Sequence, residues 1–301
     1  MGSRNSRMEI DRCRHCGLCG GVRRALNLAE RLAAEGRRVH CCGELAHSTL
    51  LQNFLREGGI SVWTGEERHW ERRDCLLIPT HGISPARRER LRSEGPDQFD
   101  GTCPIVRRNG ERIRRLSAEG FRILLFGKKN HPEVVGLAGQ GPVAICESES
   151  DLPRPDGRRT ALFSQTTADG EELAHFAAVV RDRFPNLKAV PSLCREVLLR
   201  RKELYQALAD GSYGWVVVVA GERSANGRAL AAIARRAGVA VAVAERPEEL
   251  PNCIPWGVGG RLLIASATSA PDWAVDGMEQ FLRKRAGGLF PAAGLGGAGP
   301  I

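Results

Sequence analysis

Three cysteines of this chain each stand where a helix is expected to begin. They are Cys19 in GLCGGVRRAL, Cys103 in GTCPIVRRNG and Cys194 in PSLCREVLLRR. Because their separations are 84 and 91 residues, three similar α/β units could each contribute one thiolate to a shared centre. Backbone N–H groups at a helix N-terminus favour the thiolate, so we expect lowered pKa values at these thiols, which suits metal ligation.

Small polar residues follow five expected strands, at the point where each strand ends. The strands are expected at 76–78, 123–126, 161–163, 216–220 and 262–265, and the segments after them read PTHGISP, GKKNHPE, SQTTAD, GERSANG and SATSAP. In parallel α/β folds, ligands bind outside the carboxyl ends of the strands, where helix N-termini present N–H groups to anions. Helix capping would explain any one such turn. Five of them, two with a histidine, favour convergence on one anionic ligand.

The alternation of short apolar runs with longer amphipathic segments predicts an α/β fold with parallel-rich sheets. The cysteine spacing divides it into three similar α/β units at residues 1–102, 103–193 and 194–285. The stretch 286–301 has six Gly, two Pro and no charged side chain, which predicts a mobile tail.

The composition is that of a water-soluble protein with an anionic partner. Of 301 residues, 42% are hydrophobic and 26% charged, and 44 basic against 35 acidic side chains leave a net charge of +9. No apolar run approaches the roughly 20 residues of a membrane span, and no signal-peptide core is present, which predicts a cytoplasmic protein with no membrane partner. There, ten cysteines favour metal or redox chemistry over disulfides. Basic and aromatic residues do not interleave, so nucleic acid is not expected as a partner.

Seven segments follow one another in a recognisable order. They read GLCGGVRRAL, PTHGISP, FDGTCPIV, GKKNHPEVVG, SQTT, SANGRAL and SATSAP. Together they resemble the 4-hydroxy-3-methylbut-2-enyl diphosphate reductase family, also called the LytB family, over about residues 13 to 280. HPEVVG and TCPIV, with THG and SQTT, are the specific signals.

The resemblance implies a three-domain α/β fold in a pseudo-threefold arrangement around a central [4Fe–4S] cluster, which Cys19, Cys103 and Cys194 hold. The fourth iron has no protein ligand in the family and can take the substrate hydroxyl. Two electrons then break the allylic C–O bond, water leaves, and isopentenyl and dimethylallyl diphosphate form. The implied partners are this small diphosphate and an acidic electron-donor protein such as a ferredoxin or flavodoxin.

The resemblance also assigns side chains to the substrate. Those implied to bind the diphosphate are His47, His81, His131, Ser224, Asn226 and Ser269. Glu133 corresponds to the acid that relays protons, with His131 beside it, and Thr166 to the threonine that bonds the substrate hydroxyl. A carboxyl beside a diphosphate is expected to have a raised pKa, as a proton donor at neutral pH requires.

The chain departs from the family pattern near the expected site. Ala225 replaces a usual second serine, His47 is followed by Ser instead of Asn, and Val197 takes the place of a threonine. The pattern's Arg and Gln correspond to Arg200 and Arg201, which adds charge. These changes leave two alternatives open: a paralogue that reduces a different substrate, or a non-catalytic Fe–S electron carrier or redox sensor.

Additional cysteines precede Cys19. Cys13 and Cys16 complete a C-x₂-C-x₂-C spacing with it, typical of a ferredoxin-type loop, and Cys41-Cys42 is also extra. The first pair could form a second metal or Fe–S site, supply a fourth cluster ligand, or be incidental. Of the remaining residues, Cys75, Cys146 and Cys253 are expected in the core, and His15, His40, His69 and His175 on the surface.

Overall fold

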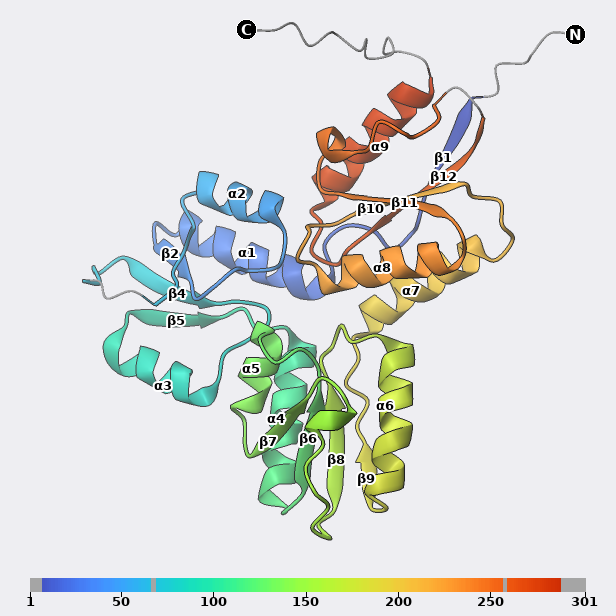
Figure 1. Ribbon diagram of the computed structural model, residues 1–301. Helices are drawn as coiled ribbons and strands as arrows, with labels where there is room; N and C mark the ends of the chain where they lie inside the picture. The colour runs from blue at the N-terminus through green and yellow to red at the C-terminus, as the bar shows by residue number, and fades with distance from the viewer. Residues whose placement is uncertain (1–6, 66–68, 257–258, 288–301) are drawn as a thin grey trace, which may run out of the picture. The chain divides into compact units, whose positions relative to one another are not determined.

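The computed structural model describes residues 7–65, 69–256 and 259–287 (Figure 1). The tail predicted at 286–301 lies outside these residues from position 288 onward. Within the described part, the strands form three four-stranded sheets in which every pairing is parallel, as predicted. The chain divides into two compact units: residues 18–198, called the 18–198 unit, and residues 1–17 with 199–301, called the two-segment unit.

The first sheet of the 18–198 unit has the strand order β3-β2-β4-β5. These strands are β3 (Ser61–Val62), β2 (Arg38–Cys41), β4 (Asp74–Ile78) and β5 (Asp97–Asp100). Helices α1 (Gly20–Ala34) and α2 (Thr49–Glu57) bury apolar side chains against one face of this sheet, and α3 (Pro85–Glu94) packs on the other through Leu91. All five residues of β4 are buried, as expected of a strand covered on both faces.

The second sheet of this unit has the order β7-β6-β8-β9. Its strands are β7 (Val143–Cys146), β6 (Arg122–Phe126), β8 (Thr160–Ser164) and β9 (Leu187–Ala189). Alternate residues of β6 and β8 face opposite ways, so α4 (Pro104–Ala118) and α5 (Pro132–Ala138) pack with Ile123 and Phe163 on one face. Helix α6 (Gly170–Arg183) packs with Leu124 and Leu162 on the other. A short 3₁₀ turn, η1 (Glu149–Asp151), follows β7.

The two-segment unit contains the third sheet, in the order β1-β12-β10-β11. Its strands are β1 (Met8–Arg12), β12 (Gly260–Ser266), β10 (Trp215–Val219) and β11 (Ala240–Ala244). Residues of α7 (Arg195–Leu208) and α8 (Ala225–Arg236) pack with one side of β10 and β12, and α9 (Asp272–Ala286) lies against β1 and β10. A 3₁₀ turn, η2 (Pro247–Glu249), follows β11. The unit boundaries expected at 102 and 193 stay a prediction, but β1 joins a sheet whose other strands lie more than 200 residues away.

Most of the remaining cysteines and histidines lie where the sequence predicts. Cys75 and Cys146 are fully buried on β4 and β7, whereas the prediction for Cys253 is wrong, because that residue is exposed. The prediction of a surface position is also wrong for His40, which is 7% exposed on β2. Its Nδ1 lies 2.5 Å from Ser61 Oγ and its Nε2 2.9 Å from Asp74 Oδ1, so both ring nitrogens have partners inside the protein.

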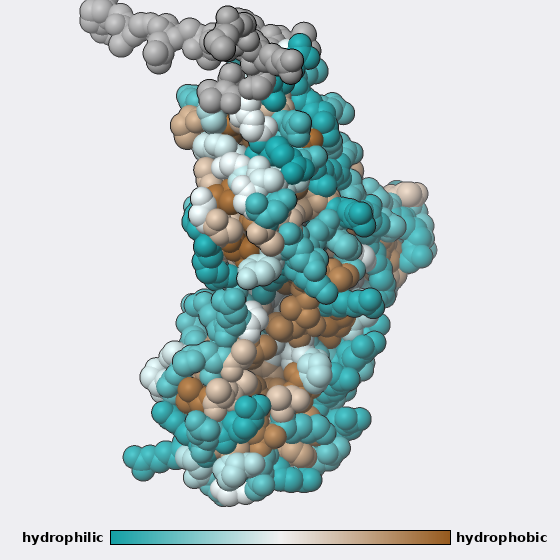
Figure 2. Space-filling model, turned by 90° about the vertical axis from the view of Figure 1, so that its right-hand side faces the viewer, coloured by the Kyte–Doolittle hydropathy of each residue, from teal (hydrophilic) through white to brown (hydrophobic). Residues whose placement is uncertain are grey.

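None of the described helices is long and apolar enough to cross a bilayer. On the face shown in Figure 2, hydrophilic residues predominate and the hydrophobic ones gather in separate patches.

The Asp74 carboxylate on β4 bonds to the side chains of Arg38 and His40 on β2. We expect its contribution to stability to be lost in acid. Burial opposes its charge, but the Glu71 N–H, His40 and Arg38 bond to it and lower its pKa from 3.8 to about 2. Because the pKa of Asp74 is lower in the folded state than in the unfolded state, its carboxylate stabilises the fold at pH values above the unfolded pKa. This stabilisation is lost as the pH falls from about 4 toward 2. Asp74→Asn should therefore cost about 1–2 kcal/mol of unfolding free energy at pH 7 and almost nothing near pH 2.

Urea unfolding followed by circular dichroism at several pH values measures this difference. Asp97→Asn, which removes a carboxylate that is 70% exposed in its pair with Arg37, is the control and should change little at any pH. A loss at Asp74→Asn that did not depend on pH would contradict the role given to its charge.

Candidate active site

The three cysteines at expected helix starts converge in the 18–198 unit. Cys19 is the N-cap of α1, Cys103 is the N-cap of α4, and Cys194 directly precedes α7. A Cβ atom at Gly21 would lie 2.9 Å from the Sγ of Cys103 and 3.8 Å from that of Cys19, so the glycine leaves room beside the two thiols. The charge of Cys194 raises the pKa of Cys103, and the charge of Cys19 raises the pKa of Cys194, so the three thiols are near one another.

Backbone hydrogen bonds fix two of these cysteines to strand ends. The Cys103 N–H donates to the carbonyl oxygen of Thr80, two residues after β4, at 2.9 Å. The Cys194 N–H donates to the carbonyl oxygen of Thr166, two residues after β8, also at 2.9 Å. The polar turns after β4 and β8 therefore contact the cysteines directly.

The pKa values of Cys103 and Cys194 differ from the prediction. Burial raises both, although backbone N–H groups one turn into the following helices donate to each sulfur and lower them. The expectation of lowered pKa values is wrong because removal of the thiolate from water outweighs the helix N-terminus. A positively charged metal at the sulfurs would reverse this balance, since a coordinated thiol is deprotonated outright.

The donor set suits an iron–sulfur cluster better than a single ion. Within residues 7–65, 69–256 and 259–287, no three His, Cys, Asp or Glu side chains are close enough to hold one metal ion. In a cluster each thiolate binds a different iron, so three thiols around a shared space suffice. The room left by Gly21 and the sulfur-directed N–H groups of α4 and α7 fit that group.

A buried carboxyl lies beside the thiols. Glu133 is 4% exposed, its Oε1 accepts the N–H of Thr166 at 2.6 Å, and its Oε2 accepts the Thr166 hydroxyl at 2.7 Å. Burial raises the pKa of this carboxyl despite both bonds, and its charge acts on Cys103. The predicted direction is confirmed, but the cause is burial in the protein rather than a neighbouring diphosphate.

The histidines predicted around this carboxyl lie together in the same unit. His131 is the N-cap of α5 and its Nδ1 accepts the Glu133 N–H at 3.2 Å, with Pro132 opening the helix as predicted. The rings of His131 and His47 meet edge to face with centroids 5.3 Å apart. His81 Nδ1 lies 2.9 Å from the Gly82 carbonyl oxygen, and burial, followed by weaker effects that include the His47 charge, lowers the pKa of His81 to about 4. His81 is therefore neutral at pH 7.

The other three predicted residues belong to the two-segment unit. Ser224 caps α8, its Oγ accepting the Gly227 N–H at 3.1 Å, and Ser269 is buried in the turn after β12. Asn226 is 2% exposed, and neither atom of its amide has a hydrogen-bond partner among the described residues. Because β10 and β12 are neighbours in a parallel sheet, both turns lie at one edge. A buried amide with no partner in the first turn of a helix has room for a further hydrogen bond.

Arg200 is a buried residue whose importance the sequence did not show. Its guanidinium donates to the carbonyl oxygens of Gly17, Ser266 and Ala267 and to the Ser266 hydroxyl, at 2.8 to 3.2 Å. The Gly17 N–H donates to the same hydroxyl at 2.9 Å. Arg200 thus links the N-terminal segment to the turn that carries Ser269. The family pattern also has an arginine at this position, and the added charge comes from Arg201; no local signal shows that Arg200 is buried.

Cys13 and Cys16 lie in the two-segment unit. Cys13 is 7% exposed within the apolar cluster that α7 and α8 form with β10 and β12, and Cys16 packs against that cluster. Burial raises the pKa of both thiols. Cys16 is hydrogen-bonded with Ser266, next to Arg200. These surroundings are those of small core side chains.

The fold and the converging thiols define a class: an α/β protein of three parallel sheets with a cysteine site at helix N-termini. The chain belongs to the LytB family, because the family model described as "LytB protein" matches residues 10–283.

Named relatives and solved structures agree. A 4-hydroxy-3-methylbut-2-enyl diphosphate reductase of Aquifex aeolicus is 29% identical over 277 residues, 89% of this chain and 94% of the relative. One of Opitutus terrae is 31% identical over 242 residues, 76% of this chain and 83% of the relative. A solved (E)-4-hydroxy-3-methyl-but-2-enyl diphosphate reductase superposes with a TM-score of 0.70 at 27% identity, covering 92% of this chain and 99% of that one. The Plasmodium falciparum enzyme gives 0.83 at 23% identity over 90% and 86%, and shows the fold alone.

The Arg200 contacts predict a large loss of stability on truncation. Arg200→Met keeps the apolar length of the side chain but leaves four buried acceptor contacts unmade, and we expect a cost of about 3 kcal/mol in unfolding free energy. Urea unfolding measures it. Lys202→Met, at an exposed position two residues further along α7, is the control. Equal losses in the two variants would show that the buried contacts contribute nothing.

Proposed function

We propose that this chain is a [4Fe–4S]-dependent reductase that removes the hydroxyl group of 4-hydroxy-3-methylbut-2-enyl diphosphate. The products are isopentenyl and dimethylallyl diphosphate. The observation that carries the proposal is the continuity from a buried proton donor to the thiol site: Glu133 is bonded by Thr166, whose carbonyl oxygen holds Cys194. Cys19, Cys103 and Cys194 would hold the cluster, which when bound supplies two electrons and a Lewis-acidic iron.

Glu133 and Thr166 handle the protons in this proposal. Removal of the hydroxyl takes up two electrons and two protons: one proton leaves with the oxygen as water, and the other ends on the allylic carbon skeleton. Burial raises the pKa of Glu133 and so favours its protonated form, which a general acid requires. The Thr166 hydroxyl, which donates to Glu133 Oε2 at 2.7 Å, holds that oxygen in place and can turn toward a substrate hydroxyl.

Side-chain hydrogen-bond donors hold the diphosphate in this proposal. His47, His81 and His131 supply ring N–H groups in the 18–198 unit, and His81 does so as a neutral imidazole. Ser224, Asn226 and Ser269 supply hydroxyl and amide groups in the two-segment unit. The orphan amide of Asn226 supports its role, because a phosphate oxygen would satisfy the buried N–H₂ group.

A second candidate is a paralogue that reduces a related allylic diphosphate. It is favoured by Val197, which is 1% exposed and whose N–H donates to the Cys194 sulfur, so an apolar side chain lies beside the thiols. The unsatisfied amide of Asn226 argues against a carrier or sensor that binds no ligand.

Anaerobic reconstitution tests the proposal. Protein loaded with iron and sulfide should hold about four irons per chain, one [4Fe–4S] cluster, and consume the diphosphate with dithionite as the reductant. Longer and shorter allylic diphosphates distinguish the paralogue. A cluster whose EPR signal does not change with any allylic diphosphate would refute both candidates.

Glu133→Gln separates proton delivery from structure. Glutamine can accept the Thr166 N–H but carries no acidic proton, so turnover should fall at least about 100-fold while iron content is unchanged. The wild type should lose unfolding free energy as pH rises from about 4, because the native carboxyl holds its proton more tightly than the unfolded one, whereas the variant should not. Unchanged turnover would remove Glu133 from proton transfer. Glu196→Gln, on the helix after Cys194, is the control.

Iron content also tests the additional cysteines. Because Cys13 and Cys16 pack with an apolar cluster, the double variant Cys13→Ala/Cys16→Ala should retain about four irons per chain and its cluster spectrum. The matched variant Cys103→Ala should lose most of its iron. Eight irons per chain in the wild type that fall to about four in the double variant would establish a second site at Cys13 and Cys16.

A further inference from the structure

Two neighbouring helices of the 18–198 unit carry a large excess of positive charge. Helix α3 has four Arg and two Glu, and α4 has five Arg and one Glu. Together they account for much of the +9 net charge of the chain. On α4, Arg107, Arg108, Arg114 and Arg115 are all exposed, and the structure shows no ion pair for Arg107 or Arg108 among the described residues. This surface is called the α3–α4 face.

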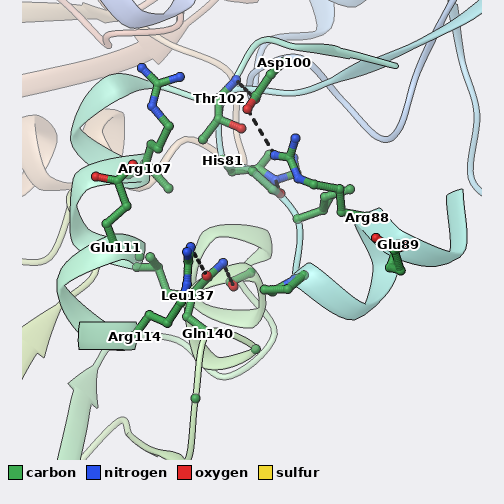
Figure 3. Close-up of a pocket in the computed structure, with 18 of the residues that line it drawn as sticks. His81, Arg88, Glu89, Asp100, Thr102, Arg107, Glu111, Arg114, Leu137 and Gln140 are labelled. Carbon is green, nitrogen blue, oxygen red and sulfur yellow. Dashed lines mark hydrogen bonds and ion pairs between the residues drawn. The ribbon is translucent and has the colours of Figure 1, made fainter. Parts of the chain in front are cut away.

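A cavity of about 680 Å³ opens between these helices (Figure 3). Arg107, Glu111 and Arg114 line it from α4, and Arg88 and Glu89 line it from α3. Its acids are largely matched by its own arginines: Arg88 pairs with Asp100 at 3.1 Å. Four arginines and three acids line the cavity, so most of the excess charge of the two helices lies on the surfaces around it, including Arg108 and Arg115. That distribution suits a broad acidic surface better than a small anion.

The cavity reaches the residues around a cluster cysteine. Thr102 and Val106 line it, and Cys103 lies between them at the first turn of α4. His81 also lines it, directly after the residue whose carbonyl oxygen holds the Cys103 N–H. The positive face and the thiol site thus lie on two sides of the same helix start.

We infer that the α3–α4 face is where a small acidic iron–sulfur protein of the ferredoxin type docks to deliver electrons to the Cys103 side of the cluster. The inference rests on the proposed function, since that reaction consumes two electrons, which two reduced donors supply one at a time and are oxidised in doing so. Neither helix carries an aromatic residue on which bases could stack, so nucleic acid fits this face poorly.

Charge reversal on α4 tests the docking. The iron-loaded wild type and Arg107→Glu/Arg108→Glu are compared for binding of an acidic [2Fe–2S] ferredoxin by calorimetry at low and physiological salt. We expect the dissociation constant to rise at least about tenfold at low salt in the variant, with a smaller difference at higher salt. Reduction of the cluster by ferredoxin should slow in stopped flow by a similar factor, while reduction by dithionite stays unchanged.

The control makes the same change of charge elsewhere in this unit. Arg181→Glu/Arg183→Glu alters exposed residues of α6, which packs on the opposite sheet face from α4, and should bind ferredoxin like the wild type. Equal weakening in both variants would overturn the inference, as would duplex DNA that bound the wild type more tightly than ferredoxin and lost affinity in the α4 variant. The two proposals can fail separately. If dithionite drives no turnover but only the α4 variant binds ferredoxin more weakly, the substrate assignment is wrong and the docking face is supported.

Discussion

Thr166 is the residue on which the arrangement of the site depends. Its carbonyl oxygen accepts the N–H of Cys194, while its own N–H and hydroxyl donate to the two carboxyl oxygens of Glu133. A strand end, a helix start and an acid are thereby fixed through one residue. Thr80 repeats half of this arrangement by accepting the N–H of Cys103 two residues after β4. In both places a backbone carbonyl just after the end of a strand accepts the N–H of a cysteine at the start of a helix. The strand ends therefore position the thiols directly.

Burial raises the pKa values of the acidic groups around this residue and lowers that of a histidine. Glu133, Cys103 and Cys194 are all moved toward their neutral forms, and His81 is neutral as well. A region with so few charges suits the proposed cluster, whose iron would stabilise the thiolates, and burial favours the protonated form of the carboxyl beside it. Positive charge is placed instead on the outer surface of α3 and α4. With this separation, surface charge would attract the proposed partner while burial favours the neutral form of the acid inside.

Strand ends and helix starts could be predicted from sequence because they depend on local patterns. The run HPEVVG contains a capping histidine, a proline at the first helical position and an acid in the first turn, and the structure has each in place. What could not be predicted depends on contacts distant in the chain. The pairing of β1 with β12, the burial of His40 between Ser61 and Asp74, and the exposure of Cys253 have no local signal. The thiol pKa values were mispredicted for the same reason, since a helix N-terminus is visible in sequence and burial is not.

Arg200 and Asn226 show how a structural polar residue differs from a binding one. Both are almost fully buried in the two-segment unit, 4% and 2% exposed. Three nitrogen–carbonyl contacts and one to a hydroxyl satisfy most of Arg200, so its role is complete within the protein. Asn226 has none on either amide atom, and a buried amide in that state costs free energy unless something external bonds to it. The fold accepts this cost in the first turn of α8, where backbone N–H groups favour an anion. The proposed diphosphate would accept a hydrogen bond from the amide N–H₂ group at this helix start.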